Sequence, residues 1–370
     1  MDSLIQKAQD RLDEKHNDSN RPTNVEDMEL EELLSNHKAS IKVIGCGGGG
    51  GNTVNRIAEV GVLGTETIAI NTDAQDLLYT TADKKILIGR DLAKGLGAGG
   101  QPKIGRDSAK ESEKEIRAAL QGSDMVFITC GLGGGTGTGS APVVAEISKK
   151  SGALTVAIVT MPFKMEGGRR TENAIIGLEL LEKNVDTLIV IPNDKLMEIA
   201  HDLPLHTAFK VADEILTNAV KGIAELVTKA GLVNLDFADV RTVMGDGGVA
   251  LIGVGESDSH DRAKQAVDKA LHNPLLDVTI DGAKGALINI IGGPDLKLEE
   301  ARTIVEEIST KLNNDAPIIW GAQMSDDLEG LLRVMLIVTG VTSEQITGSR
   351  SSKNLGKSEK EMNLGIEFMD

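Results

Sequence analysis

From residue 41 onward, short apolar runs of strand length alternate with stretches in which apolar residues recur at helical spacing. The runs that predict strands are 41–44, 67–70, 84–89, 125–130, 154–161, 187–191, 249–255, 285–292, 317–322 and 331–339. Helical spacing predicts helices over 106–120, 166–183, 260–271 and 297–312. This alternation predicts a mainly parallel sheet covered on both faces, with a ligand at the carboxyl ends of its strands.

The longest helical pattern spans 206–230 and stops at Gly231. A long apolar helix placed after the first six strands can join two domains. We therefore predict a nucleotide-binding domain over 39–205, a central helix over 206–230, and a smaller α/β domain over 231–342 with 331–339 as an inner strand. An acidic arm (1–38) precedes this body, and a polar tail with an apolar tip (343–370) follows it.

The glycine-rich stretch 131–140, GLGGGTGTGS, lies between a predicted strand and a predicted helix. Such a loop directs unpaired backbone N–H groups and the positive end of the helix dipole at whatever binds there. Thr136 and Thr138 add hydroxyl donors, and the loop carries no lysine. It therefore predicts a phosphate site that differs from the P-loop, with charge neutralised by amides, the dipole and a metal ion.

Two further glycine loops follow strands, at 45–52 and 95–102. The first, taken with Asp73 at the end of the next strand, also fits a dinucleotide-binding dehydrogenase. Three glycine loops that converge from successive strand ends favour a chain of several phosphates, so a nucleoside triphosphate is the preferred ligand.

Several charged positions have both a functional and a structural interpretation. Glu166 and Arg170 can grip ribose and base, or form an i,i+4 surface pair. Asp213 can reach a purine edge, or serve as a solvated acid near a helix start. Asp236 and Asp239 fit plain helix capping, which the local pattern alone favours.

Composition narrows the function classes. The net charge of −17 argues against a nucleic-acid partner, because phosphate backbones are bound by clustered Lys and Arg. Two cysteines, Cys46 and Cys130, give no disulfide framework and fit a reducing cytoplasm. No apolar run approaches the ~20 residues of a membrane span, so we expect no direct membrane insertion.

Seven motifs in order resemble the FtsZ family, the tubulin-like GTPases of prokaryotic cell division, in their archaeal form. They are GCGGGGGN (45–52), NTDAQ (71–75), GLGAGGQPKIG (95–105), GGGTGTG (133–139), PFKMEG (162–167), PND (192–194) and NLDFADVRTVM (234–244). The resemblance covers about residues 39–340. It implies a GTP-binding domain and a C-terminal activation domain joined by the central helix.

The resemblance also implies the site residues. A GTP/GDP site with Mg²⁺, and K⁺ as a further cation, is expected, and the 95–105 loop is expected to sense the γ-phosphate. The expected nucleotide contacts are Gly47, Gly48, Gly49, Gly50, Gly51, Asn52, Asn71, Asp73, Ala98, Gly99, Gly100, Gly134, Gly135, Thr136, Gly137, Thr138, Gly139, Glu166, Arg170, Asn193, Phe209 and Asp213. No protein metal ligand is assigned.

Asn234, Asp236 and Asp239 match the loop that family members insert into the neighbouring subunit's nucleotide. The resemblance therefore implies a head-to-tail homopolymer that hydrolyses GTP only when assembled. It places the protein in the cytoplasm at the mid-cell division site. The tip LGIEFM resembles archaeal tails and suggests a membrane adaptor such as SepF. A nucleotide-binding regulator without turnover stays open as the alternative function, and a dinucleotide-binding oxidoreductase as a less favoured one.

Overall fold

The computed structural model describes residues 39–199, 205–229, 231–233, 235–276, 283–312 and 316–341. The predicted arm 1–38, the tail 343–370 and Asn234 lie outside these ranges.

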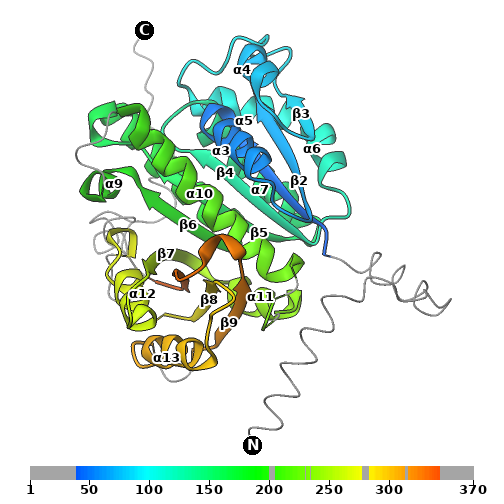
Figure 1. The fold of residues 1–370 in the computed structure, drawn as a ribbon. Coiled ribbons are helices and arrows are strands. Elements are labelled where there is room, and N and C mark those ends of the chain that lie inside the picture. Colours follow the sequence, from blue (N-terminus) through cyan, green and yellow to red (C-terminus); the bar gives the residue numbers. More distant parts are fainter. Residues whose placement is uncertain are drawn as a thin grey trace, which may run out of the picture. The chain divides into compact units, whose positions relative to one another are not determined.

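A ten-stranded sheet runs through the described residues in the order β3-β2-β1-β4-β5-β6-β7-β10-β8-β9 (Figure 1). The pairings in these ranges are parallel except for the two that β10 makes, with β7 and with β8. The strands are β1 Ile41–Cys46, β2 Thr65–Asn71, β3 Lys84–Leu87, β4 Met125–Gly131, β5 Leu154–Met161, β6 Thr187–Pro192, β7 Gly248–Ser257, β8 Gly285–Gly292, β9 Ile318–Met324 and β10 Leu332–Thr339. The predicted mainly parallel sheet is confirmed, and 331–339 forms an inner strand as expected.

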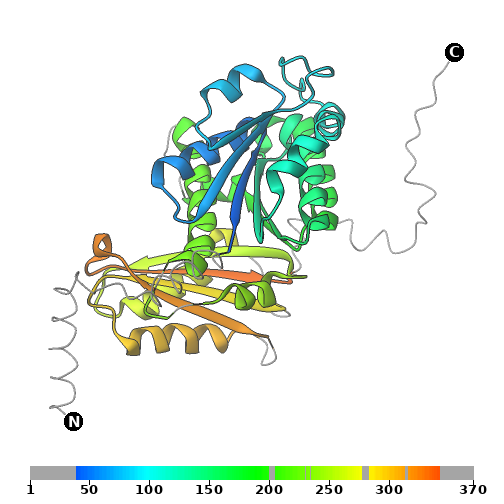
Figure 2. The ribbon, with the colours of Figure 1, turned by 90° about the vertical axis from the view of Figure 1, so that its right-hand side faces the viewer.

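Helices cover both faces of this sheet because alternate side chains of the strands enter two separate apolar cores. One core is closed by α5 Pro102–Glu111, α6 Glu113–Leu120, α7 Thr136–Lys150, α8 Gly168–Asn184, α12 Arg262–Leu271 and α13 Leu298–Ser309. The other is closed by α3 Gly47–Val60, α9 Asn193–Ile199, α10 Leu205–Thr228 and α11 Phe237–Met244. In Figure 2 the yellow-orange α13 lies along one face of the C-terminal strands.

Helix α10 spans the two lobes of the sheet. Its residues Leu216, Ala219 and Ile223 are buried in the core that also contains Ile158 of β5 and Leu287 of β8. Its 24 residues correspond to ~36 Å of helix. The first half of α10 therefore belongs to the nucleotide-binding lobe and its end to the C-terminal lobe. No helix in the described ranges is both long and apolar enough to cross a bilayer.

Three predicted elements are corrected. The helix expected over 106–120 starts earlier, at Pro102, and is divided at Ser112 into α5 and α6. The helix expected over 166–183 is a short 3-10 turn, η1 Lys164–Glu166, followed by α8, because Gly167 between them has a φ of 99°. The third strand ends at Leu87, since Gly89 turns the chain with a φ of 68°.

Candidate functional site

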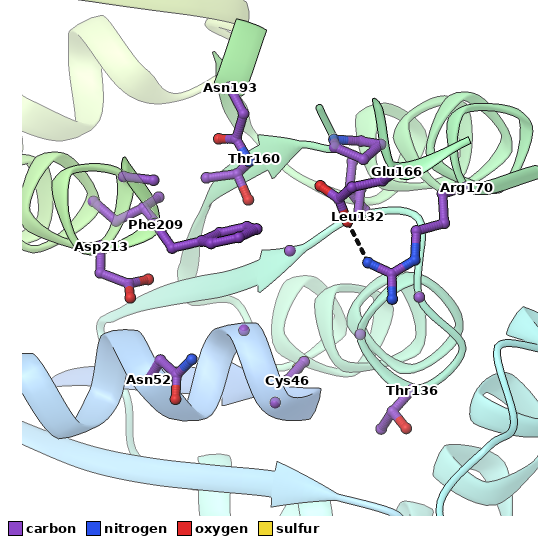
Figure 3. A pocket seen from close by; sticks show the side chains of 18 of the residues that line it. Cys46, Asn52, Leu132, Thr136, Thr160, Glu166, Arg170, Asn193, Phe209 and Asp213 are labelled. Atoms are coloured by element: carbon purple, nitrogen blue, oxygen red, sulfur yellow. Dashed lines mark hydrogen bonds and ion pairs between the residues drawn. The ribbon is translucent and has the colours of Figure 1, made fainter. Parts of the chain in front are cut away.

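A cavity of about 340 Å³ lies at the carboxyl ends of β1, β4, β5 and β6 (Figure 3). Its size falls within the range of small-molecule sites. It is lined from α3, α7, α8 and α10 as well as from the strand ends. The expected contacts that line it are Gly48, Gly49, Asn52, Gly134, Gly135, Thr136, Gly137, Glu166, Arg170, Asn193, Phe209 and Asp213.

Two helix N-termini meet at one side of this cavity. Helix α3 starts at Gly47 and α7 at Thr136, and a Cβ on Gly47 would lie 2.8 Å from the Gly137 nitrogen. Only glycine permits this approach, and Gly47 also has a φ of 69°. Unpaired amides and two dipole ends therefore converge on a small volume, which favours a polyphosphate. Among the residues that line the cavity, Arg170 is the only cation.

The opposite side of the cavity offers acceptors and an aromatic face. Phe209 and Asp213 project from α10, and Asn193 starts α9 (Figure 3). The Oδ1 atom of the buried Asn193 has no hydrogen-bond partner in the described structure. A buried acceptor without a partner is costly unless a ligand supplies a donor. This side therefore fits a planar base that presents N–H groups.

Asp213 occupies an unusual position for an acid. It lies eight residues after the first residue of α10, so its interpretation as a solvated acid near the helix start is wrong. Desolvation by burial raises the pKa of Asp213 to about 6, and the adjacent Thr53 hydroxyl opposes that shift. At neutral pH this carboxyl group is therefore mostly ionised, and its oxygens can accept hydrogen bonds from a ligand.

Glu166 and Arg170 form the i,i+4 ion pair that their spacing allows, at the rim of the cavity. The second carboxylate oxygen of Glu166 accepts a 2.9 Å hydrogen bond from the backbone nitrogen of Phe163. The two residues form the predicted ion pair and also line the cavity, so the structural and the functional interpretation are compatible.

The remaining expected contacts lie outside the cavity wall. They are Gly47, Gly50, Gly51, Asn71, Asp73, Ala98, Gly99, Gly100, Thr138 and Gly139. Asp73 caps α4 (Ala74–Tyr79) by accepting from the nitrogens of Gln75 and Asp76. The Asn71 amide donates to Asp76 at 2.6 Å. Asp73, the acid on which the dinucleotide alternative depended, caps this helix through Oδ1 and does not line the cavity.

Some of these residues support the cavity wall without lining it. A Cβ on Gly50 would lie 2.5 Å from the Thr129 carbonyl oxygen, so this glycine allows α3 to lie close to β4. The Thr138 hydroxyl accepts a 2.9 Å hydrogen bond from the Gly133 nitrogen, which holds the glycine loop against the start of α7. Ala98 lies beside Gly135, and the Asn173 amide on α8 donates to the carbonyls of both Gly100 and Gly133 at 3.3 Å.

Seven residues of the wall were not among the expected contacts, although four of them lie in motifs that the sequence analysis named. They are Cys46, Gly131, Leu132, Thr160, Pro162, Ala212 and Leu216. Most stand at or just beyond the carboxyl ends of strands, a position that could have identified them.

Cys46 is buried, and burial raises the pKa of its thiol to about 12. Burial also raises the pKa of the Cys130 thiol well above its usual value, so both act as small apolar groups.

Asp236 and Asp239 do not line the cavity. They begin α11, which follows the far end of α10 (Figure 1). From Asp213 to the end of α10 at Thr228 the axis rises ~22 Å. The preceding segment is attached to β9 by a 2.8 Å bond from the Leu232 nitrogen to the Ala322 carbonyl. These two carboxylates therefore lie far from the cavity of their own chain.

The described residues contain no group of three or more His, Cys, Asp or Glu side chains that could hold a metal ion. A divalent cation at the cavity would depend mainly on ligand oxygens and water. That is how Mg²⁺ is usually bound beside phosphates, so the residues present fit a cation carried by a nucleotide.

The family model described as "Tubulin/FtsZ family, GTPase domain" matches residues 40–201, and the one described as "FtsZ family, C-terminal domain" matches residues 248–342. The cell division protein FtsZ 1 of Thermococcus kodakarensis is 64% identical over 317 residues, which are 86% of this chain and 85% of that protein. FtsZ 1 of Methanocaldococcus jannaschii is also 64% identical, over 86% of this chain and 87% of its own.

Solved structures agree. The structure described as "FtsZ dimer, empty (M. jannaschii)" has a TM-score of 0.83 at 63% identity, over 87% of this chain and 94% of its own. The CetZ2 protein of Haloferax volcanii, at 22% identity, has a TM-score of 0.72 over 83% of this chain and 96% of its own, and shares the fold. The chain therefore belongs to the Tubulin/FtsZ family, and within it to the FtsZ cell-division proteins.

Proposed function

We propose that this protein binds GTP in the cavity and hydrolyses it as a subunit of a head-to-tail filament of the cell-division apparatus. One observation carries the proposal. The cavity contains a phosphate cradle, whereas the carboxylates expected to position water, Asp236 and Asp239, lie beyond the other end of α10. Only a second subunit can bring such carboxylates to the phosphates, and a heterologous contact of this kind extends into a filament.

The two sides of the cavity favour a guanine nucleotide. Guanine presents N1–H and N2–H₂ as donors, which match the acceptors on Asp213 and the buried Oδ1 of Asn193. Adenine lacks both of these donors and carries its single amino group at C6, so it cannot pair with both acceptors in the same arrangement. The triphosphate then extends toward the N-termini of α3 and α7, with Glu166 and Arg170 beside the ribose.

The residues outside the wall keep secondary roles in this proposal. Ala98 and Gln101 lie beside Gly135, so the loop that carries Ala98, Gly99 and Gly100 is close enough to respond to a γ-phosphate. Bound Mg²⁺ supplies charge neutralisation at the phosphate oxygens, and K⁺ is a second candidate cation at the subunit junction. Asp236, Asp239 and Asn234 of the neighbouring subunit orient the attacking water by polar contacts.

The proposed division of labour follows the predicted domains: GTP binding by 39–205, connection by 206–230 and activation by 231–342. The two matched family domains, 40–201 and 248–342, support this division, as does the span of α10 between them. The relative solved as an "FtsZ dimer" supports self-assembly.

We further propose that the protein acts in the cytoplasm at the division site, attached to the membrane by an adaptor such as SepF. The apolar tip LGIEFM on a polar tail supports this role. Deletion of 364–370 should abolish adaptor binding and leave GTP turnover unchanged. Unchanged adaptor binding by the shortened chain would contradict the docking role of the tip.

The test of the central proposal is GTP hydrolysis per subunit over a wide range of protein concentration, in Mg²⁺ and K⁺. We expect activity near zero in dilute solution and a steep rise above a threshold. Specific activity that is constant with concentration would show that each subunit is complete alone. Tight GTP binding without turnover at any concentration would favour the regulatory nucleotide sensor.

A further inference from the structure

Phe163 lies directly behind the cavity wall. It follows β5, is 1% exposed, and does not line the cavity itself. Its ring meets the ring of Phe209 edge to face, with centroids 5.2 Å apart and planes at 87°. Phe209 is 41% exposed and reaches from α10 into the cavity (Figure 3).

Phe163 also contacts Glu166, which lines the rim of the cavity. The backbone nitrogen of Phe163 donates a 2.9 Å hydrogen bond to the Glu166 carboxylate, which is paired with Arg170. Phe163 thus joins the rim pair to the aromatic face through two different parts of one residue.

An exposed phenylalanine on a helix can occupy more than one rotamer, and each would present a different surface to a ligand. An edge-to-face contact with a fully buried ring selects one orientation, because the ring quadrupoles favour that geometry. Aromatic residues are scarce in this chain, with five Phe, one Tyr and one Trp. A pair of them at the cavity is therefore a specific feature of the site.

We propose that Phe163 is a positioning residue for nucleotide binding: its ring orients the Phe209 ring so that a flat face is presented to the base. This inference rests on the proposed function, since it assumes that the cavity binds a purine nucleotide. It assigns Phe163 no contact with the nucleotide.

A double-mutant cycle tests the proposal. Phe163→Leu removes the ring and keeps the backbone nitrogen that holds Glu166. We expect it to weaken GTP affinity about three- to tenfold, the fold-change that an aromatic pair supports. In the Phe209→Leu background the same substitution should have no further effect, because Phe163 acts through Phe209. The affinity of inorganic triphosphate, measured by competition, should not change.

The control is Phe127→Leu. Phe127 is also fully buried but lies in the middle of β4, away from the cavity wall. It should lower the melting temperature comparably and leave GTP affinity unchanged. If Phe163→Leu does not fold, Phe163→Met serves in its place, because its unbranched, flexible side chain adapts to the space left by the ring.

Three results would overturn the proposal: wild-type GTP affinity in Phe163→Leu, losses from Phe163→Leu and Phe209→Leu that multiply, or an equal loss of triphosphate affinity. A wild-type protein that does not bind GTP would instead overturn the proposed function, and this inference with it.

Discussion

Asp236 and Asp239 hold each other's backbone at the start of α11. The Oδ1 atom of Asp236 accepts from the Asp239 nitrogen at 2.8 Å, and Oδ2 of Asp239 accepts from the Asp236 nitrogen at 3.3 Å. This reciprocal cap fixes the two carboxylates on one rigid helix end. The capping interpretation and the water-positioning role are therefore compatible, since the cap also preorganises the side chains.

Asparagine variants separate these two roles. Asn is as good an N-cap as Asp, so Asp236→Asn should change stability by only a few tenths of a kcal/mol. Asp239→Asn keeps an acceptor oxygen at N3 but loses a charge that the helix dipole favours, so it should cost at most about 1 kcal/mol. Each should lower GTP turnover about a hundredfold or more, because the charge that orients water is lost. Asp236→Ala should lose turnover and also ~1 kcal/mol of stability. Turnover at the wild-type rate in Asp239→Asn, measured above the assembly threshold, would contradict the assigned role.

GTP affinity should depend on pH through Asp213. Burial raises the pKa of Asp213 to about 6, and only the ionised carboxylate keeps both of its oxygens as acceptors for guanine N–H groups. Affinity should therefore be full above pH 7 and fall by about tenfold per pH unit below 6. Calorimetric titration of GTP into the protein at several pH values between 5 and 8 measures this dependence.

Asp213→Asn is the matched variant for that titration. Since the nucleotide's phosphates also titrate in this range, the ratio of the two proteins' affinities isolates Asp213. Because burial raises this pKa from 3.8, the group destabilises the ligand-free fold above pH 4. Asp213→Asn should thus stabilise ligand-free protein by up to about 3 kcal/mol at pH 7, with the gain vanishing near pH 4. An affinity ratio constant with pH would refute the ionised role.

Two glycines of the stretch 131–140, Gly134 before α7 and Gly139 within it, should respond differently to alanine. A Cβ on Gly139 would lie 2.0 Å from the Pro102 carbonyl oxygen, so Gly139→Ala must separate α7 from α5. We expect a loss of about 1–3 kcal/mol of stability. A Cβ on Gly134 meets nothing within 4 Å, so Gly134→Ala should fold normally and weaken GTP binding by obstructing the phosphates. Unchanged GTP affinity in Gly134→Ala would show that this position does not approach the ligand.

Assembly should respond to ions because each subunit carries a net charge of −17. Added Mg²⁺ or moderate salt screens the repulsion between subunits, so both should lower the concentration threshold for filaments. Light scattering with GTP measures the threshold. A signal that falls steadily with added salt would indicate that attractive ion pairs dominate the contact.

Much of the fold was predictable from local pattern. The apolar runs located the strands, because a strand buried on both faces is a continuous apolar segment. The exceptions were backbone breaks. Gly167 with positive φ divides η1 from α8, and Ser112 divides α5 from α6, within stretches whose apolar spacing continues across the break.

The sequence by itself determined the glycine loops after strands, the long helix that joins the lobes, and the residue types that a phosphate and a purine require. These are local properties of spacing and side-chain chemistry. Only the tertiary structure decided which loop residues line the cavity. The packing of α3 and α7 places Gly50 against the backbone of β4 and Gly139 against that of α5, whereas Gly49 and Gly134 line the cavity. Only it separated Asp236 and Asp239 from the cavity of their own chain, since the rigid length of α10 lies between them.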